Sequence, residues 1–279
     1  MKHGIFLPPF AELADARRVA RLAADAEQAG WEGLYLWDHM LAVPGMAVAE
    51  AWTTMTAIAM ATSQIRFGAL VTPLARRRPW VLARQIATLD QVSGGRLVVG
   101  IGLGDDGWRE FSAFGEETAP RVRGELLDES VQIVRELLAG NGLLHAGRHY
   151  AIDSPPLLPR PVQDPVPFWA AVRWPNRKPL ARAARLEGCF PIFRNAGSRP
   201  APPPAAEVMQ VRAELTGLGA ARSQDLSVCC ALHLLPAAER AGAAAALADA
   251  GVTWLLEAFA PGQDAAAVEQ YVRGGPPAG

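Results

Sequence analysis

The sequence predicts a closed barrel of eight parallel strands, each followed by a helix. The repeating unit is clearest at residues 65–101, where two short apolar runs without polar alternation flank a stretch with apolar residues at helical spacing. Parallel strands need such a crossover between them. Eight units of this kind follow one another without an obvious linker, whereas a doubly wound open sheet more usually has about five to six strands. We therefore expect a single barrel domain over residues 1–279.

Four units of strand and helix occupy the first half of the chain. The predicted strands are residues 4–8, 33–37, 65–71 and 96–101. The first helix ends at Gly30, the second covers about 48–62, and the third begins at Pro79, where proline fits the first turn. The fourth helix ends near Gly140, and its apolar stripe consists of Leu127, Val131, Val134 and Leu138.

Residues 141–166 interrupt this pattern. Their many glycines and prolines rule out a long helix and predict an excursion over the surface between the fourth helix and the fifth strand. The alternation then resumes. The predicted strands are residues 168–172, 188–193, 226–234 and 252–259, and the predicted helices cover 178–186, a stretch ending near 215, 237–250 and a last stretch through Val272.

Composition excludes several kinds of function. The chain has 27 Lys and Arg against 28 Asp and Glu, a formal net charge of -1, so it has no global positive field to attract nucleic acid. No window approaches the roughly 18 apolar residues of a membrane span, and the N-terminal apolar run is too short for a signal peptide, so we expect a cytoplasmic protein. The three cysteines, two of them adjacent, show no metal-ligand spacing and are interpreted as buried small hydrophobic residues.

In a barrel of this kind, chemistry lies at the carboxyl ends of the strands. Asp38 and His39 directly follow the second predicted strand. His39 is the best candidate for proton transfer, because the adjacent acid could orient it or raise its pKa. A histidine that only caps a strand end is an equal alternative. His145 and His149 have the spacing of a zinc pair, but no nearby carboxylate supports a metal, so no metal site is expected.

The loop after the fourth strand matches the dinucleotide-binding pattern G-x-G-x-x-G. Two aspartates inside the loop, the first of them Asp105, would oppose a pyrophosphate, and the motif does not open the chain. We therefore reject the dinucleotide interpretation. Gly102 and Gly104 are instead expected to let a planar ligand approach the end of the strand closely.

Two groups of basic residues could bind an anion. Arg173, Arg177 and Lys178 surround the start of the helix predicted after the fifth strand, where the helix dipole and free N–H groups favour phosphate. The run of three arginines at 76–78 lies at a strand end, so an anion clamp or a solvated turn would both fit it. The first group is the stronger candidate.

Three segments carry a recognisable family pattern. They are AEQAGWEGLYLWDHM, then RRPWVLARQIATLDQVSGGRLVVGIGLG with the following FSAFG, and PRPVQDPVPFWAAV leading to ARAARLEG. Most of residues 1–195 thereby resembles the bacterial luciferase-like superfamily, whose members are flavin-dependent monooxygenases and deazaflavin-dependent oxidoreductases on a (β/α)₈ barrel. Residues 196–279 carry little of the pattern, and Glu187-Gly188 stands where the family commonly has Asp-Gly.

The resemblance implies where a flavin-like ring would lie. It would rest against the third and fourth strands, often beside a bulge with a non-prolyl cis peptide, here near Ala69, Leu70 and Val71.

The resemblance also implies site residues of the deazaflavin branch. Asp38 and His39 would correspond to the acid and histidine after the second strand there, and Asp105 to an acidic residue after the fourth. Luciferase-type flavin enzymes tend to have an arginine in that second loop, whereas this chain has Leu103, a departure that weakens a luciferase-like oxygenation.

Together these features indicate an oxidoreductase that transfers hydride between the deazaflavin coenzyme F420 and a small organic substrate. F420 is expected in preference to FMN. A monooxygenase dependent on reduced FMN and a noncatalytic flavin-binding protein are the alternatives, while a metal-dependent barrel hydrolase lacks ligand clusters at the strand ends. The sequence leaves assembly as a homodimer open. We expect a partly apolar substrate pocket built from Trp37, Met40, Trp108, Phe111, Trp174 and residues 194–204.

Overall fold

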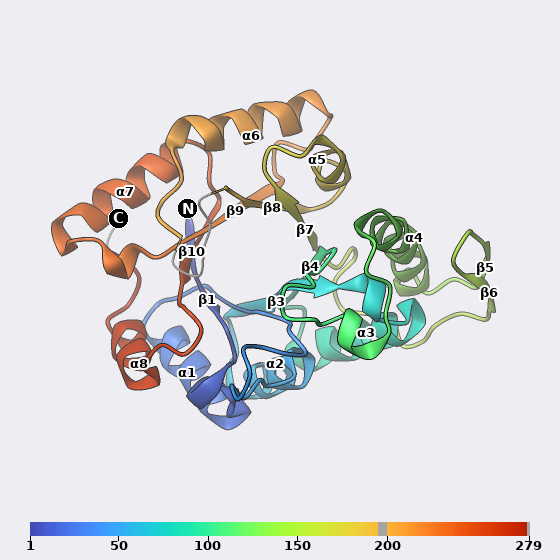
Figure 1. The fold of residues 1–279 in the computed structure, drawn as a ribbon, viewed down its shortest axis with the longest axis horizontal. Helices are drawn as coiled ribbons and strands as arrows, with labels where there is room; N and C mark the ends of the chain where they lie inside the picture. Colours follow the sequence, from blue (N-terminus) through green and yellow to red (C-terminus); the bar gives the residue numbers. More distant parts are fainter. Residues whose placement is uncertain (195–199, 278–279) are drawn as a thin grey trace.

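The computed structural model describes residues 1–194 and 200–277. Eight parallel strands close into a barrel in the order β1, β10, β9, β8, β7, β4, β3, β2, so the predicted fold class is confirmed (Figure 1). The barrel strands are β1 (Lys2–Leu7), β2 (Gly33–Leu36), β3 (Arg66–Pro73), β4 (Leu97–Gly102), β7 (Phe168–Arg173), β8 (Gly188–Ile192), β9 (Asp225–Cys230) and β10 (Trp254–Ala258).

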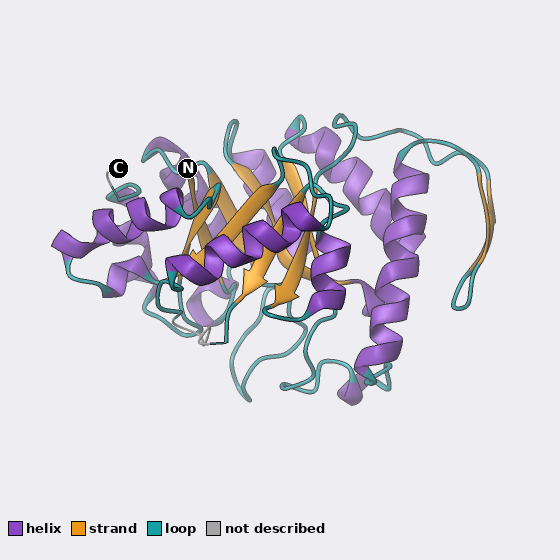
Figure 2. Ribbon diagram, turned by 90° about the horizontal axis from the view of Figure 1, so that it is seen from above, coloured by secondary structure: helices purple, strands orange, loops and turns teal. Residues whose placement is uncertain are grey.

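Helices surround the barrel on the outside, as Figure 2 shows. They are α1 (Ala16–Gln28), α2 (Ala51–Ala61), α3 (Pro79–Ser93), α4 (Pro120–Leu138), α5 (Arg177–Ala183), α6 (Ala205–Gly217), α7 (Ala237–Asp249) and α8 (Ala265–Arg273). The signals at both ends of α3 act as predicted, because Pro79 occupies its first turn and Gly94, with φ of 66°, ends it in the left-handed region. Among the described helices, none combines the length and the apolar character that a membrane span requires.

Two elements end earlier than their sequences predict. Residues 232–234, expected as the end of a strand, form the short 3-10 helix η4 (Leu232–Leu234) instead. The reason is local, since the backbone N–H of His233 donates to a carboxylate oxygen of Glu257 on β10 rather than continuing a ladder. The helix predicted over 178–186 ends at Ala183, and tight turns complete the connection to β8.

The excursion between α4 and β7 contains an element that the density of glycine and proline did not reveal. Residues Leu143–Ala146 and Ala151–Ser154 pair as an antiparallel hairpin, β5 and β6. The hairpin lies outside the ring of helices, beyond α4 (Figures 1 and 2). Glu129 on α4 holds it, accepting from Nε2 of His145 at 2.9 Å and from the backbone N–H groups of His149 and Tyr150 at 3.0 and 2.9 Å.

The barrel interior is filled at its amino-terminal half by three large aromatic rings. Tyr35 stacks on Trp169 with a centroid distance of 5.3 Å, and Trp254 meets both edge-on at 5.8 and 5.6 Å. All three side chains are fully buried. They close the barrel from below, so space for a ligand remains only at the carboxyl ends of the strands.

Strands β3 and β4 approach each other closely where they lead to that space. A Cβ atom on Gly68 would lie 2.1 Å from the carbonyl oxygen of Val98, and one on Gly100 would lie 2.2 Å from the carbonyl oxygen of Ala69. Only glycine fits at these two positions.

Candidate active site

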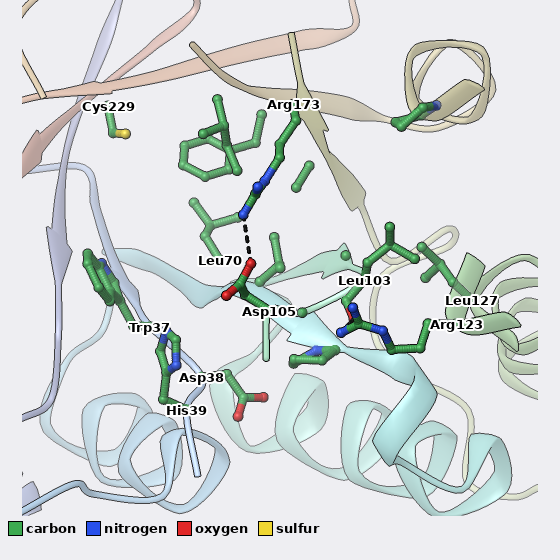
Figure 3. A pocket seen from close by; sticks show the side chains of 18 of the residues that line it. Trp37, Asp38, His39, Leu70, Leu103, Asp105, Arg123, Leu127, Arg173 and Cys229 are labelled. Carbon is green, nitrogen blue, oxygen red and sulfur yellow. Dashed lines mark hydrogen bonds and ion pairs between the residues drawn. The ribbon is translucent and has the colours of Figure 1, made fainter. Parts of the chain in front are cut away.

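A cavity of about 520 Å³ lies at the carboxyl ends of the barrel strands. Its volume is typical of small-molecule sites. Each of the eight barrel strands, or the loop directly after it, contributes to the wall (Figure 3). One contributor from each, in barrel order, is Phe6, Ala258, Cys229, Ile192, Arg173, Gly102, Val71 and Trp37.

His39 follows β2 and lies on the cavity wall. Its Nδ1 is 2.7 Å from Oε2 of Glu110, a buried side chain from the loop after β4. Oε1 of Glu110 accepts from the backbone N–H groups of Met40 and Leu41. Burial raises the pKa of the Glu110 carboxyl. The opposing effects are larger: the hydrogen bond and charge of His39, the hydrogen bond from the Met40 N–H and the charge of Arg76 all lower this pKa. The pKa of Glu110 therefore lies below the ordinary 4.5.

The ionised Glu110 fixes the arrangement of the His39 ring. A carboxylate accepts the proton on Nδ1, so Nε2 is the nitrogen left for another partner, and it has none among residues 1–194 and 200–277. Three aromatic rings surround the imidazole: Phe10 and Trp37 at 5.6 Å and Trp108 at 5.0 Å between centroids. The ring is thus held at one orientation against an apolar surround.

Asp38 is buried, and its carboxylate is engaged away from His39. Oδ1 accepts from Nη2 of Arg76 at 3.1 Å, and Oδ2 accepts from Nη2 of Arg77 at 2.8 Å. The acid that contacts the His39 ring is therefore Glu110 and not the adjacent Asp38, contrary to the expectation from sequence. The same contacts occupy two of the three arginines at 76–78, and the guanidinium of Arg78 lies over the Trp80 ring at 5.8 Å.

Strands β3 and β4 form the floor of the cavity. Leu70, Val71, Gly102 and Gly104 line it, whereas Ala69 is buried in the core outside the barrel. The peptide bond between Leu70 and Val71 is cis, and the register of β3 against β4 shifts between Ala69 and Thr72. The bulge and the non-prolyl cis bond are therefore present where the sequence resemblance implied them.

Arg173 and Asp105 meet over the centre of the cavity (Figure 3). Nη2 of Arg173 donates to Oδ2 of Asp105 at 2.9 Å, and both side chains are mostly exposed. Arg177 and Lys178 are also exposed at the start of α5, but neither belongs to the cavity wall. The structure thus brings Arg173 and Asp105 together and leaves the other two basic residues at the rim.

A second basic group lies where the cavity passes between α4 and α5. Arg123 of α4 and Arg182 of α5 both line it. Arg182 donates to Oδ1 of Asp128 at 2.6 Å. Arg123 is buried and forms no ion pair among the described residues: Nη1 reaches the carbonyl oxygen of Leu103 at 3.4 Å, Nε has no partner, and the guanidinium lies 4.5 Å from the Phe111 ring centroid. A buried arginine without an ion pair at a cavity wall is suited to bind an anion.

The aromatic pocket expected from sequence is present only in part. Trp37 lines the cavity, and Trp108 packs on His39 behind the wall. Met40 is exposed on the loop beyond it, and Phe111 and Trp174 are buried in the packing around it. Of the loop expected to contribute at 194–204, residues 195–199 lie outside the described part of the chain, and Pro200 lines the cavity.

His145 lies in strand β5 rather than in a loop, whereas His149 lies in the turn between β5 and β6. Both belong to the β5–β6 hairpin and bind carboxylates of α4. In residues 1–194 and 200–277, no three side chains of the metal-binding types come together.

A family model described as luciferase-like monooxygenase matches residues 1–274, almost the whole chain. The chain belongs to the luciferase-like monooxygenase family. The match extends through residues 196–274, where the sequence by itself showed little of the pattern.

A curated F420-dependent enzyme is similar to part of this chain. The F420-dependent glucose-6-phosphate dehydrogenase of Amycolatopsis mediterranei is 30% identical over 169 residues, which is 59% of this chain and 50% of that protein. The chain thus spans about half the length of the curated relative that it matches.

Two solved structures share the fold at low sequence identity. The coenzyme F420-dependent tetrahydromethanopterin reductase from Methanopyrus kandleri has a TM-score of 0.74 at 18% identity and covers 98% of this chain and 96% of its own. The monooxygenase RslO1 from Streptomyces bottropensis has a TM-score of 0.79 at 20% identity and covers 98% and 97%.

Two residues of this site are not among those predicted from the sequence, for different reasons. Arg123 lies four positions before Leu127, on the apolar stripe of α4, so an arginine on a buried helical face was a signal that could have been used. Glu110 lies in an irregular loop, and nothing in its local pattern shows that the loop returns to His39, 71 positions away in the chain.

Proposed function

We propose that this protein is an oxidoreductase that transfers hydride between the deazaflavin coenzyme F420 and a small organic substrate. The observation that carries the proposal is the Glu110–His39 pair, with an Nδ1 to Oε2 distance of 2.7 Å, at the wall of a cavity built on a bulged β3 strand. A histidine whose second nitrogen is free can exchange a proton with a hydroxyl or carbonyl oxygen. The F420-dependent relative supports the choice of coenzyme.

The cavity fits a planar ring with an anionic tail. Its floor at Leu70, Val71 and Gly102 is apolar. Gly102 adds no side chain to the floor, and a Cβ atom at this position would lie only 2.4 Å from Val71. The far end of the cavity holds Arg182 and the buried Arg123, which forms no ion pair in the described part of the chain. We assign the floor to the ring and the basic end to the phosphate.

The exposed basic residues would act on the outer part of the same tail. Arg173 is mostly exposed, and an exposed pair such as Arg173–Asp105 contributes little stability, so a phosphate can replace the carboxylate at small cost. Arg177 and Lys178, exposed at the start of α5, extend the positive rim.

When bound, the deazaflavin supplies a carbon that accepts or releases a hydride, and it is a two-electron carrier that reacts poorly with oxygen. The protein supplies the proton transfer. In the oxidative direction, Nε2 of His39 accepts the proton of a substrate hydroxyl while Glu110 stabilises the resulting imidazolium. The rings of Phe10, Trp37 and Trp108 exclude water from this step. Asp38 contributes indirectly, by holding Arg76 and Arg77 and with them the loop after β3.

A monooxygenase dependent on reduced FMN is the second candidate. The same floor would accept the flavin ring, which is the observation in its favour. Against it stands Leu103, an apolar residue on the wall of the loop after β4, where luciferase-type enzymes tend to have an arginine. A barrel that binds a flavin without turnover is the third candidate. Only an activity assay distinguishes it from the two enzymes.

The remaining expectations belong to the same proposal. We propose that residues 1–279 work as one barrel domain in the cytoplasm and that two copies associate. Exposed apolar side chains on α2 and α3, namely Met60, Trp80 and Val81, are surfaces that a second copy would cover. Sedimentation at equilibrium tests the dimer, which a monomer at micromolar concentration would exclude.

An anaerobic turnover assay tests the proposed reaction. The protein is mixed with oxidised F420 and a panel of uncharged and phosphorylated alcohols, and the visible absorbance of the coenzyme is followed. We expect bleaching with at least one alcohol. Oxygen uptake with reduced FMN and a substrate, without any change in F420, would instead establish the second candidate.

A further inference from the structure

Arg76 joins the two loops that carry His39 and Glu110. It ends the short 3-10 helix η2 (Leu74–Arg76), which follows β3, and it is not part of the cavity wall. Its Nη2 donates to the backbone carbonyl oxygen of Asp38 at 2.7 Å and to Oδ1 of the same residue at 3.1 Å. Its Nη1 lies 3.3 Å from Oε1 of Glu110. One guanidinium thus contacts both the residue that precedes His39 and the carboxylate that holds the His39 ring.

The two contacts of Arg76 differ in kind. The contact with Asp38 consists of hydrogen bonds, whereas Nη1 has no hydrogen-bond partner in the described part of the chain and acts on Glu110 through its charge. The side chains of Arg76 and Glu110 are only 6% and 3% exposed, so salt and solvent screen this attraction weakly. Within residues 1–194 and 200–277, the only other group that pairs with Glu110 is the His39 ring. Arg76 is therefore the fixed counter-charge of this carboxylate.

The other charged groups around the pair make no such contact. Asp38 turns its carboxylate away from the His39 ring (Figure 3), and Arg77 binds Oδ2 of Asp38 at 2.8 Å. Arg77 thus shares Asp38 with Arg76 but has no contact with Glu110. In the described structure, the charged residues of neighbouring segments that form no ion pair or hydrogen bond with His39 or Glu110 are Glu50, Asp105, Asp106, Arg109 and Arg123.

The counter-charge changes how tightly the His39 ring binds a second proton. An ionised carboxylate at Nδ1 favours the protonated imidazole, and a nearby cation disfavours it. With Arg76 in place, Glu110 still accepts the Nδ1 proton, but part of the field of its carboxylate is cancelled. Loss of Arg76 alone would leave Glu110 without its fixed counter-charge, so the imidazole would bind the second proton more tightly.

We infer that Arg76 is a positioning residue of this site, which holds Glu110 and, by compensating its charge, lowers the proton affinity of His39, so that Nε2 can accept the proton of a substrate hydroxyl. This inference rests on the proposed function and names the residue that regulates its proton acceptor. In the oxidative direction the O–H proton passes to Nε2, and the hydride of the adjacent carbon passes to the deazaflavin. Only the form of His39 without a proton on Nε2 supports this step.

The titration of His39 tests the inference without coenzyme or substrate. The Cε1–H resonances of the five histidines are followed by NMR between about pH 5 and pH 9, and His39→Asn identifies the resonance of His39. We expect the midpoint for His39 in Arg76→Gln to lie about one pH unit above that of the wild type. Arg76→Lys keeps the charge and should restore at least half of this shift.

Arg77→Gln is the matched control, because Arg77 shares Asp38 with Arg76 but does not contact Glu110. It should move the midpoint less than a third as far. If Arg76→Gln does not fold, the double variant Asp38→Asn/Arg76→Gln is compared with Asp38→Asn alone, because the double variant loses the cation together with its carboxylate partner. The midpoint should then rise by the same amount between these two proteins.

The same shift should appear in turnover with F420. In the anaerobic assay, kcat/KM of Arg76→Gln for the alcohol that bleaches the coenzyme fastest should be about tenfold below the wild type at pH values under both midpoints. Above the raised midpoint it should approach the wild type. A residue that only supports the fold would lower kcat/KM by the same factor at every pH.

The outcomes separate this inference from the function on which it rests. If no alcohol reduces F420 but the NMR midpoint rises in Arg76→Gln and not in Arg77→Gln, the proposed reaction is wrong and the effect of Arg76 on His39 stands. If turnover occurs and the midpoint stays unchanged in Arg76→Gln, or rises equally in Arg77→Gln, the inference about Arg76 is wrong and the oxidoreductase stands.

Discussion

His39 takes its chemical character from a residue that is remote in sequence. Glu110 lies 71 positions away and contacts Nδ1, while the neighbouring Asp38 binds two arginines. The sequence placed the histidine at the correct end of β2 because parallel strands bring their carboxyl ends to one side. It could not identify the partner, because that depends on how the irregular loop after β4 folds back.

Replacing His39 tests its proposed role. His39→Asn should lower turnover with F420 by about a hundredfold and leave the dissociation constant of the coenzyme within about twofold, because a proton acceptor is lost but no phosphate contact. Steady-state kinetics and a coenzyme titration measure the two effects. His145→Asn, on the hairpin outside the cavity, is the matched control and should retain full turnover. Equal loss in both variants would show a general effect on folding.

The Glu110 carboxylate should also affect stability in a pH-dependent way. Its pKa is lowered on folding, so it stabilises the native state above its ordinary value of 4.5, and this contribution is lost as the pH falls through the lowered pKa. Glu110→Gln should reduce the free energy of unfolding by about 3 kcal/mol at pH 7. In urea titrations the difference from the wild type should narrow below about pH 4.5. A difference that does not change with pH would contradict an ionised Glu110.

Burial ranks two of the arginines assigned to the anionic tail of the coenzyme, Arg123 and Arg173. Arg123 is buried and without a carboxylate partner in the described residues, whereas Arg173 is mostly exposed and already paired. Charge-assisted contacts contribute roughly 1.5 to 3 kcal/mol, so Arg123→Met should weaken F420 binding by about 10- to 100-fold and Arg173→Ala by about tenfold. Fluorescence titrations measure both. Arg121→Ala, on the exposed side of α4, is the control and should bind F420 with normal affinity. Unchanged affinity in both Arg123→Met and Arg173→Ala would show that these arginines do not bind the phosphate.

At the scale of elements, the sequence predicted the strands and helices whose apolar residues repeat at a regular spacing. The barrel strands appear as continuous apolar runs because both of their faces are buried, and the helices appear through their stripes and stop signals. The β5–β6 hairpin was missed because it has no core of its own: its inward side chains pack on α4, and side chains such as Leu144 stay exposed. A two-stranded ribbon of this kind depends on what anchors it.

The anchor of the hairpin is Glu129, and its removal should release that element alone. Glu129→Ala deletes the acceptor of three hydrogen bonds from residues 145–150. Hydrogen exchange of residues 143–154 should then become about 30-fold faster, corresponding to about 2 kcal/mol of local stability, with the barrel unchanged. Glu136→Ala, at an exposed position of the same helix, should leave exchange as it is. Faster exchange throughout the barrel would show that the hairpin supports the whole fold.

At the scale of the whole molecule, the fold follows from eight repeats of one unit, and the site follows from the closure of the barrel. Closure gathers strand ends from residues 6 to 258 around one cavity, with an arginine-lined end between α4 and α5 and an apolar end above β8, β9, β10 and β1. Sequence alone indicated Arg173, which lies over the centre of the cavity, but neither the arginines of the first end nor the apolar character of the second. The three-dimensional separation of charge from apolar surface is what suggests a coenzyme at one end and a substrate at the other.

Parallel fluorescence titrations of the purified protein with F420 and with FMN test the central claim most directly. The proposed assignment predicts that F420 binds at least tenfold more tightly than FMN, and that Arg123→Met weakens F420 binding. Tight binding of FMN with no measurable binding of F420 would contradict it and would favour the flavin-dependent monooxygenase.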